Sequence, residues 1–167
     1  GGVGMGAEAL DIAYLGGDAL LAGTFTTIQG IGRTRLARVS IDAPATVDAT
    51  WDPTTNGFEM TTLEVGHDDG VYVGGFVNQI DSQPRNRLAK LIGPDGSPDP
   101  AWVADTYWTA LNAIAIQANG DVLIGGTWRG DLSSDYVSLV PRFGIAALPP
   151  AIPVVVLPDP LHSNGFE

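Results

Sequence analysis

The chain has few side chains that could carry out catalysis by a recognised route. It contains no cysteine, which excludes disulfides, thiolate nucleophiles and cysteine-ligated zinc. Its two histidines, His67 and His162, stand far apart without a recurring partner, so we expect both at the surface. Neither a G-x-S-x-G nucleophile motif nor an H-E-x-x-H zinc motif occurs. We therefore predict that the protein is not an enzyme, although its 19 carboxylates leave a glycosidase-like pair open.

Two acidic turns contain the oxygen ligands that calcium prefers. They are Asp68-Asp69-Gly70 and Asp95-Gly96-Ser97-Pro98-Asp99. Neither fits the twelve-residue calcium loop D-x-[DN]-x-[DN]-G, and Asp before Gly is common in tight hairpin turns. We therefore predict two hairpin turns and no cofactor, with calcium as the alternative at these turns.

Basic side chains recur at intervals of about 51 residues. They occupy two positions within the repeated interval. Arg38, Lys90 and Arg142 share the first position, and Arg35 and Arg87 share the second. Few other charges lie in these stretches. We therefore predict half-buried cations that pair with a recurring aspartate, either Asp48 or Asp99. A ring of cations that binds a ligand where the units converge is the alternative.

An internal repeat accounts for this spacing. Three segments return in order: 22–25 (AGTF) as 73–76 (VGGF), 35–39 (RLARV) as 87–91 (RLAKL), and 48–51 (DATW) as 99–102 (DPAW). The middle pair is offset by about 52 residues and the other two by about 51. We therefore place a one-residue insertion in the loop between the glycine and arginine segments.

A third, looser copy of the repeat follows. Residues 119–128 (NGDVLIGGTW) match 16–25 (GGDALLAGTF), and 140–143 (VPRF) match 36–39 (LARV). This copy ends near Ile145 without the final tryptophan segment. The chain therefore contains about three units.

Each unit consists of short apolar stretches separated by turn residues. Asp69-Gly70, Asp95-Gly96 and Asn119-Gly120 are dipeptides typical of hairpins. No window of helical length shows a clean period of 3.6 residues. Several strands are apolar on both faces, which suits sheets covered on both sides. We predict an all-β fold of three antiparallel units, at about 8–58, 59–107 and 108–145, followed by an extended tail, 146–167.

The aligned segments resemble the bacterial delta-sixty β-propeller repeat. Its pattern D-G-K-I-L-V-G-G-S-F-T is similar to 119–128, R-N-R-L-A-R-L is similar to 85–91, and D-G-S-x-D-x-x-W is similar to 95–102. The resemblance covers residues 8–145 and implies that each unit is a propeller blade. It implies no particular activity, because such repeats occur in large secreted or surface proteins with no common one. Propellers have four to eight blades, so about three units leave two open ends.

Aromatic residues mark the junctions between the units. We predict that Phe25, Phe76 and Trp128 are core wedges and that Trp51 and Trp102 anchor the unit junctions. A sugar-stacking platform is the alternative for exposed tryptophan rings.

Paired glycines follow the central apolar stretch of the second and third units. We predict that Gly74-Gly75 and Gly125-Gly126 mark a bulge or a close backbone approach to the next sheet. A phosphate-binding loop would need G-x-x-x-x-G-K before a helix, and the sequence has neither.

Composition restricts the partners. The 167 residues are 44% apolar, enough for a folded core, and carry a formal net charge of −11. This negative charge disfavours nucleic acid, which binds basic surfaces. No apolar run approaches the ~18 residues of a membrane span. We predict neither nucleic-acid binding nor membrane insertion, and carbohydrate remains an alternative partner.

The tail is rich in proline and valine. Ile152, Val154, Val155, Val156 and Leu157 form a stretch of high strand propensity. It is a candidate assembly strand, which either folds back onto its own domain or adds to the sheet edge of a neighbour. The final Asn-Gly-Phe-Glu, residues 164–167, is similar to the end of some secreted proteins of gammaproteobacteria.

These features together indicate a role in assembly. The chain begins with glycine and shows no leader, so we expect a processed product or part of a longer protein, located outside the cell or at its surface. We predict a non-catalytic structural module that self-associates, as a homo-oligomer or polymer, through its open repeat ends and C-terminal strand addition. Such a module would suit a filament or appendage. The alternative is a carbohydrate-binding or carbohydrate-active propeller fragment.

Overall fold

The described part of the chain consists of β-strands, turns and loops. The structure is a computed structural model that describes residues 7–104, 108–128 and 145–148. These ranges contain three antiparallel sheets of three strands each and two ribbons of two strands, with no helix. The predicted all-β fold is therefore confirmed. No described segment is a helix with the length and hydrophobicity needed to cross a membrane.

The first sheet has the strand order β1-β2-β5. It contains β1 (Ala9–Leu15), β2 (Asp18–Gly23) and β5 (Leu36–Ser40). A ribbon of β3 (Thr27–Ile28) and β4 (Ile31–Gly32) lies in the connection from β2 to β5. The two residues between β1 and β2 are glycines with positive φ angles, which makes this tight hairpin turn accessible without strain.

The second sheet repeats this topology in the order β6-β7-β10. It contains β6 (Met60–Val65), β7 (Val71–Gly75) and β10 (Leu88–Leu91). The ribbon of β8 (Gln79–Ile80) and β9 (Gln83–Pro84) occupies the same place in the β7–β10 connection.

The third sheet has the order β11-β12-β13. It contains β11 (Trp108–Ile116), β12 (Val122–Trp128) and β13 (Ile145–Leu148). Strand β13 pairs with β12 as β5 pairs with β2, so it takes the place that the sequence alignment gave to 140–143. Those four residues lie outside the described part of the chain. The predicted boundary between third unit and tail, at residue 145, falls on the first residue of β13.

The innermost strand pair of every sheet carries a β-bulge at the same position. The register shifts between Ala9 and Asp11, between Met60 and Thr62, and between Leu111 and Ala113. A bulge re-aims the strand and increases its twist. Its recurrence shows that the sequence repeat is also a repeat of backbone structure.

Backbone hydrogen bonds correct the alignment of the first two units. Gly23 N donates to Arg35 O, and Gly75 N donates to Arg87 O, so Gly23 corresponds to Gly75. The glycine and arginine segments therefore share one spacing, and the predicted insertion between them is wrong. The extra residue lies in the turn from β6 to β7, where 67–69 replace the two glycines of the first hairpin.

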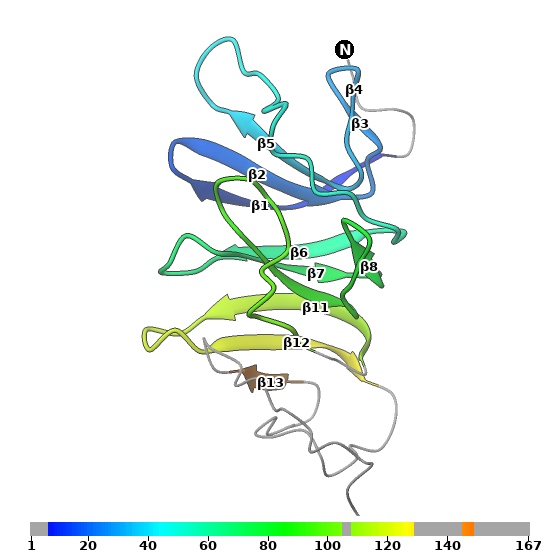
Figure 1. Cartoon of the computed structure of the whole chain (residues 1–167), viewed down its shortest axis with the longest axis vertical. Helices are drawn as coiled ribbons and strands as arrows, with labels where there is room; N and C mark the ends of the chain where they lie inside the picture. Colours follow the sequence, from blue (N-terminus) through cyan, green and yellow to red (C-terminus); the bar gives the residue numbers. More distant parts are fainter. Residues whose placement is uncertain (1–6, 105–107, 129–144, 149–167) are drawn as a thin grey trace, which may run out of the picture.

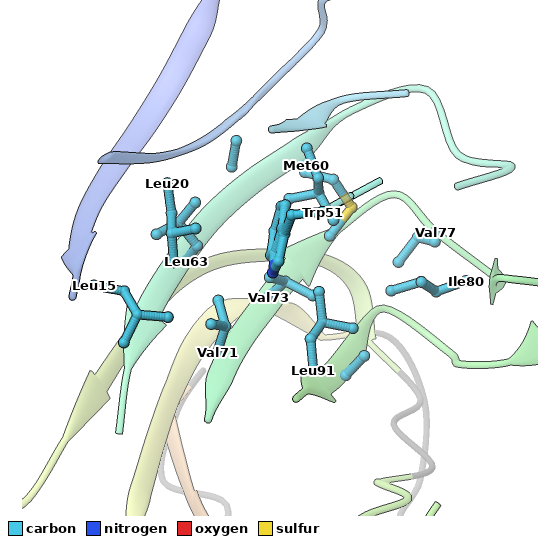
Figure 2. Close-up of a cluster of buried hydrophobic side chains, with 13 residues drawn as sticks. Leu15, Leu20, Trp51, Met60, Leu63, Val71, Val73, Val77, Ile80 and Leu91 are labelled. Atoms are coloured by element: carbon cyan, nitrogen blue, oxygen red, sulfur yellow. The ribbon is translucent and has the colours of Figure 1, made fainter. Parts of the chain in front are cut away.

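The three sheets lie face to face, with the second between the other two (Figure 1). Buried side chains form one core cluster between the first and second sheets and another between the second and third. Figure 2 shows the first of these clusters, in which Trp51 lies among aliphatic side chains such as Met60 and Val73. Each sheet–sheet contact is thus an apolar layer.

Candidate functional site

An ion pair stabilises the outer strand of the first sheet. Arg38 Nε lies 2.7 Å from Asp18 Oδ2 and 3.8 Å from Asp48 Oδ2. Burial alone would raise the pKa of Asp48, but hydrogen bonds from Thr50 and the charge of Arg38 hold it below its usual value. The predicted pairing with Asp48 is confirmed. The closer partner, Asp18, was not predicted, because it lies on the neighbouring strand.

The second sheet has the same cluster with a lysine in place of the arginine. Lys90 Nζ lies 2.6 Å from Asp68 Oδ2, 3.6 Å from Asp99 Oδ2, and 5.5 Å from the centre of the Tyr72 ring. Burial alone would lower the pKa of Lys90, but the hydrogen bond to Asp68 raises it overall. The same bond lowers the pKa of Asp68. Both cations are therefore paired with aspartates of their own units.

The third sheet breaks this series. Ala147 lies opposite Leu123, where Lys90 lies opposite Tyr72 in the second sheet. The predicted equivalence of Arg142 with Arg38 and Lys90 is therefore wrong. Arg142 itself lies outside the described residues. Because the three sheets do not share a cation at this position, the arrangement does not support a ring of cations.

Two buried arginines form a second repeated feature that the sequence reasoning missed. Arg33 donates from Nη1 to Gly32 O at 2.6 Å and from Nη2 to Asp48 O at 2.7 Å. Arg85 donates in the same way to Pro84 O at 2.7 Å and Asp99 O at 3.1 Å. Both side chains are only 4% exposed. The sequence did contain a signal for these residues. The pattern Arg-x-Arg occurs at both 33–35 and 85–87, so the first arginine of the pair is repeated as well as the second.

The second arginine of each pair has a left-handed backbone. Arg35 and Arg87 have φ angles of 70° and 66°. Arg35 Nε donates to the carbonyl oxygen of Phe58 at 2.9 Å, which links the first unit to the chain entering the second sheet. The Arg87 guanidinium lies 4.9 Å from the centre of the Phe76 ring. The Arg35 contact thus joins the first two units, whereas the Arg87 contact lies within the second.

The predicted core wedges differ from one another. Phe25 is fully buried, and its structural equivalent is Val77 rather than Phe76, because Arg35 N and Arg87 N donate to Phe25 O and Val77 O. Phe76 is half-buried under Arg87. The side chain of Trp128, at the end of β12, lies outside the described part.

The two described junction tryptophans are buried. Trp51 donates from Nε1 to Gly93 O of the second unit at 3.1 Å, and it packs against Gly96, where a Cβ would lie 2.9 Å from the indole ring. Trp102 makes an edge-to-face contact with Tyr72, with ring centres 5.2 Å apart. Neither Trp51 nor Trp102 presents a ring face on which a sugar could stack.

The acidic turns use their carboxylates internally. Asp68 pairs with Lys90, and Asp95 accepts hydrogen bonds from the backbone and hydroxyl of Ser97. Across the described ranges, no three His, Asp or Glu side chains gather where they could hold a metal ion. His67 is exposed, and its Nε2 lies 3.0 Å from the carbonyl oxygen of Gln117. His162 falls outside the described residues.

The most unusual surface is the outer face of the first sheet. Three large apolar side chains of β1, Leu10, Ile12 and Tyr14, are 43%, 64% and 63% exposed. Ile12 and Tyr14, with Leu21 beside Ile12 on β2, form what we call the open face. Leu10 is the bulge residue of β1 and is not part of this face. An exposed row of large apolar side chains on one strand is a candidate contact surface.

The open face has buried counterparts in the other two sheets. By strand register, Ile12 corresponds to Leu63 and Ile114, which are 2% and 9% exposed. Tyr14 corresponds in the same way to Val65 and Ile116, which pack against the core clusters. In the second and third sheets a preceding sheet covers these positions. The first sheet has large apolar side chains at these positions, and no preceding sheet covers them in the described part of the chain.

The other side of β1 faces the second sheet. Ala13 packs against the first core cluster, and Asp11 Oδ2 accepts a hydrogen bond from Leu63 N at 2.9 Å. Burial raises the pKa of nearby Glu64, and the negative charge of Asp11 raises it further. Each sheet thus presents one side to the sheet before it and the other side to the sheet after it.

The third sheet exposes the opposite kind of face. Ala113 and Ala115 on β11 are exposed and Leu123 on β12 is half-buried. We call these three residues the alanine face. By register, Ala115 and Leu123 correspond to Ala13 and Leu20, which pack against the second sheet.

The predicted assembly strand of the tail lies outside the described residues. This holds for Ile152, Val154, Val155, Val156 and Leu157. The open face and the alanine face therefore remain as the described candidates for an assembly surface.

Comparison with known proteins supports the fold at a coarse level. Residues 67–101 match a family described as a domain of unknown function (DUF5122), beta-propeller. No curated protein and no solved structure matches the chain. The matched segment covers most of the second unit and indicates a β-propeller type of repeat. The description of that family indicates no catalytic activity.

Proposed function

We propose that the chain is a non-catalytic structural module that self-associates through its open sheet faces into a homo-oligomer or polymer, such as a filament or appendage. One observation carries this proposal: Ile12 and Tyr14 are exposed at positions whose equivalents, Leu63 and Val65, pack under a neighbouring sheet. Covering such side chains yields about 25 cal/mol for each Å² of apolar surface removed from water. Association is therefore favourable for this face.

The proposal includes a repeat type and a location. We assign the units to the delta-sixty type, supported by the sequences of 85–91 and 95–102. Proteins with such repeats are secreted or lie at the cell surface, which supports the same location for this chain. The net charge of −11 would keep unassembled copies soluble.

We propose that the chain is not catalytic because four described cationic side chains are already bound by groups of the same chain. Arg38 and Lys90 are neutralised by aspartates, and Arg33 and Arg85 are held by backbone carbonyls. These side chains serve the fold and leave no charge positioned for a reacting group.

A second contact is proposed for the tail. Residues 152–157 would add as a strand to a sheet edge of a neighbouring copy. The support is their run of β-branched and aliphatic side chains, which favours an extended conformation.

The open face can be tested with a charge placed on it. In sedimentation equilibrium, we expect the wild type to show a mass that rises with concentration. Tyr14→Glu should weaken association about tenfold or more, because a carboxylate buried without a partner is costly. The control is Phe58→Glu. Phe58 is 83% exposed but lies away from the open face, so this variant should associate like the wild type.

Two results would contradict the proposal. One is a wild type that stays monomeric at every concentration. The other is equal weakening by both substitutions, which would indicate a general effect of added negative charge. Circular dichroism should show the same β-spectrum for all three proteins.

A further inference from the structure

We infer that the open face of one copy docks on the alanine face of a second copy, head to tail, in the register of the two interfaces within the chain. This inference rests on the proposed self-association and names its partner. The chain carries both halves of one interface: a row of large side chains on the first sheet and a row of small ones on the third. A second copy therefore supplies the cover that each face lacks.

The contact between the first and second sheets provides the template. On the side of the first sheet, Ala13 and Leu20 enter the shared core, and on the side of the second sheet, Leu63 and Val65 meet them. A small side chain on the inner strand of one sheet thus leaves room for larger ones on the next. This complementarity gives the interface its density.

The two uncovered faces reproduce this pairing of small with large. Ala115 and Leu123 take the positions of Ala13 and Leu20, while Ile12 and Tyr14 take those of Leu63 and Val65. A second open face would instead oppose large side chains to large ones and would leave the alanine face exposed. The faces therefore favour a heterologous contact.

A polar contact supports the same direction. At the bulge of the second sheet, Thr61 Oγ1 donates to the carbonyl oxygen of Leu111 in the third. Asn112 holds the bulge position of the third sheet and is exposed. In the inferred contact its side-chain amide would donate to Ala9 O of the second copy, because Ala9 corresponds to Leu111.

Cysteine pairing tests the contact, because the natural chain contains no cysteine. The template places Asp11 against Leu63, and the equivalent pair between copies is Ala113 with Ile12. We would prepare Ala113→Cys and Ile12→Cys separately, mix them under mild oxidation, and examine them by non-reducing electrophoresis and mass spectrometry. We expect a disulfide-linked dimer containing one copy of each variant, and much less linkage in either variant alone.

The control pair is Ala113→Cys mixed with Phe58→Cys, which is exposed but lies outside the open face. This pair should remain unlinked. Maleimide labelling of each folded variant would show that every thiol is accessible. Sedimentation of the unoxidised Phe58→Cys control should show association like that of the wild type.

The outcomes separate this inference from the proposed function. Linkage of Ile12→Cys with itself would show a face-to-face contact and overturn the head-to-tail inference while self-association stands. Association of the wild type without linkage of the mixed pair would likewise overturn it. A wild type that is monomeric under all conditions would overturn both.

Discussion

The buried arginines show how single residues hold the outer part of each unit. Arg85 bridges the carbonyl oxygen of Pro84, in the small ribbon, and that of Asp99, in the segment leading to Trp102. Arg33 makes the same bridge in the first unit. The fork of the guanidinium group suits this task, because it presents several donors in one plane.

Removing the Arg85 fork should destabilise the fold. Arg85→Met keeps most of the apolar stem but removes the donors to the carbonyl oxygens of Pro84 and Asp99. A hydrogen bond from a charged donor contributes about 1.5–3 kcal/mol, so we expect a loss of about 2–3 kcal/mol in the free energy of unfolding. Urea denaturation followed by tryptophan fluorescence would measure it.

Two further variants make this prediction specific. Arg33→Met should give a similar loss, because the same bridge exists in the first unit. Arg85→Lys should recover only part of the stability, because an ammonium group cannot reproduce the planar fork. A loss below about 0.5 kcal/mol for Arg85→Met would mean that the bridge is not a stabilising contact.

At the scale of the element, the bulged strand pair determines where glycine is needed. A Cβ at Gly75 would collide with the carbonyl oxygen of Glu59, the residue before β6, and one at Gly126 would collide with that of Ala110 on β11. The preceding Gly74 instead lies against the Leu111 side chain of the third sheet. Of the two predicted alternatives, a close approach to the next sheet thus holds for Gly74, whereas Gly75 and Gly126 lie at the bulges and approach a strand of their own sheet.

Gly75→Ala should therefore strain the second sheet. The obstacle is backbone, which cannot move aside as a flexible side chain can. We expect a loss of about 1–3 kcal/mol, the range for overpacked interiors, measured as a shift of the urea midpoint. The matched control is Gly32→Ala, since a Cβ there would meet nothing within 4 Å. Equal stability of Gly75→Ala and Gly32→Ala would contradict the proposed role of the bulge.

The sequence predicted the strands well but not their alignment. The all-β fold, the repeat and the burial of Trp51 and Trp102 could all be inferred from apolar stretches and turn residues. Letter matching, however, aligned Phe25 with Phe76, because both end a four-residue segment that contains glycine, AGTF and VGGF. Backbone hydrogen bonds align Phe25 with Val77, since a hairpin turn absorbs the extra residue. Similar side chains in a short motif are weaker evidence of equivalence than the strand register.

At the scale of the whole molecule, the open face is unusual in the side on which its large residues lie. An alternating strand normally turns its large apolar side chains toward the neighbouring sheet, whereas β1 exposes them. In β1 the large residues Ile12 and Tyr14 point away from the neighbouring sheet, and Asp11 and Ala13 point toward it. The alternation was visible in the sequence, but it does not reveal which side meets a neighbour. Only the stacking of the sheets shows which side of β1 is covered. The residues that form the open face could therefore not be predicted from the sequence.

The proposed tail contact gives a prediction at the same scale. Val155→Pro removes a backbone donor from the middle of the candidate strand, and proline is excluded from paired strand interiors. We expect association to weaken about tenfold, with stability unchanged, measured by sedimentation and urea denaturation. The control is Ser163→Pro, outside the valine run. Loss of stability without loss of association would show that the tail folds onto its own domain.

The ion pair of Lys90 has a practical consequence for following the motions of the molecule. Lys90 is the chain's single lysine, and only 11% of its side chain is exposed on the edge strand β10. A lysine-specific endoprotease consequently has one peptide bond to cut, and it must wait until β10 detaches from β7. The cleavage rate of the unmodified protein would therefore report how often this edge opens under native conditions.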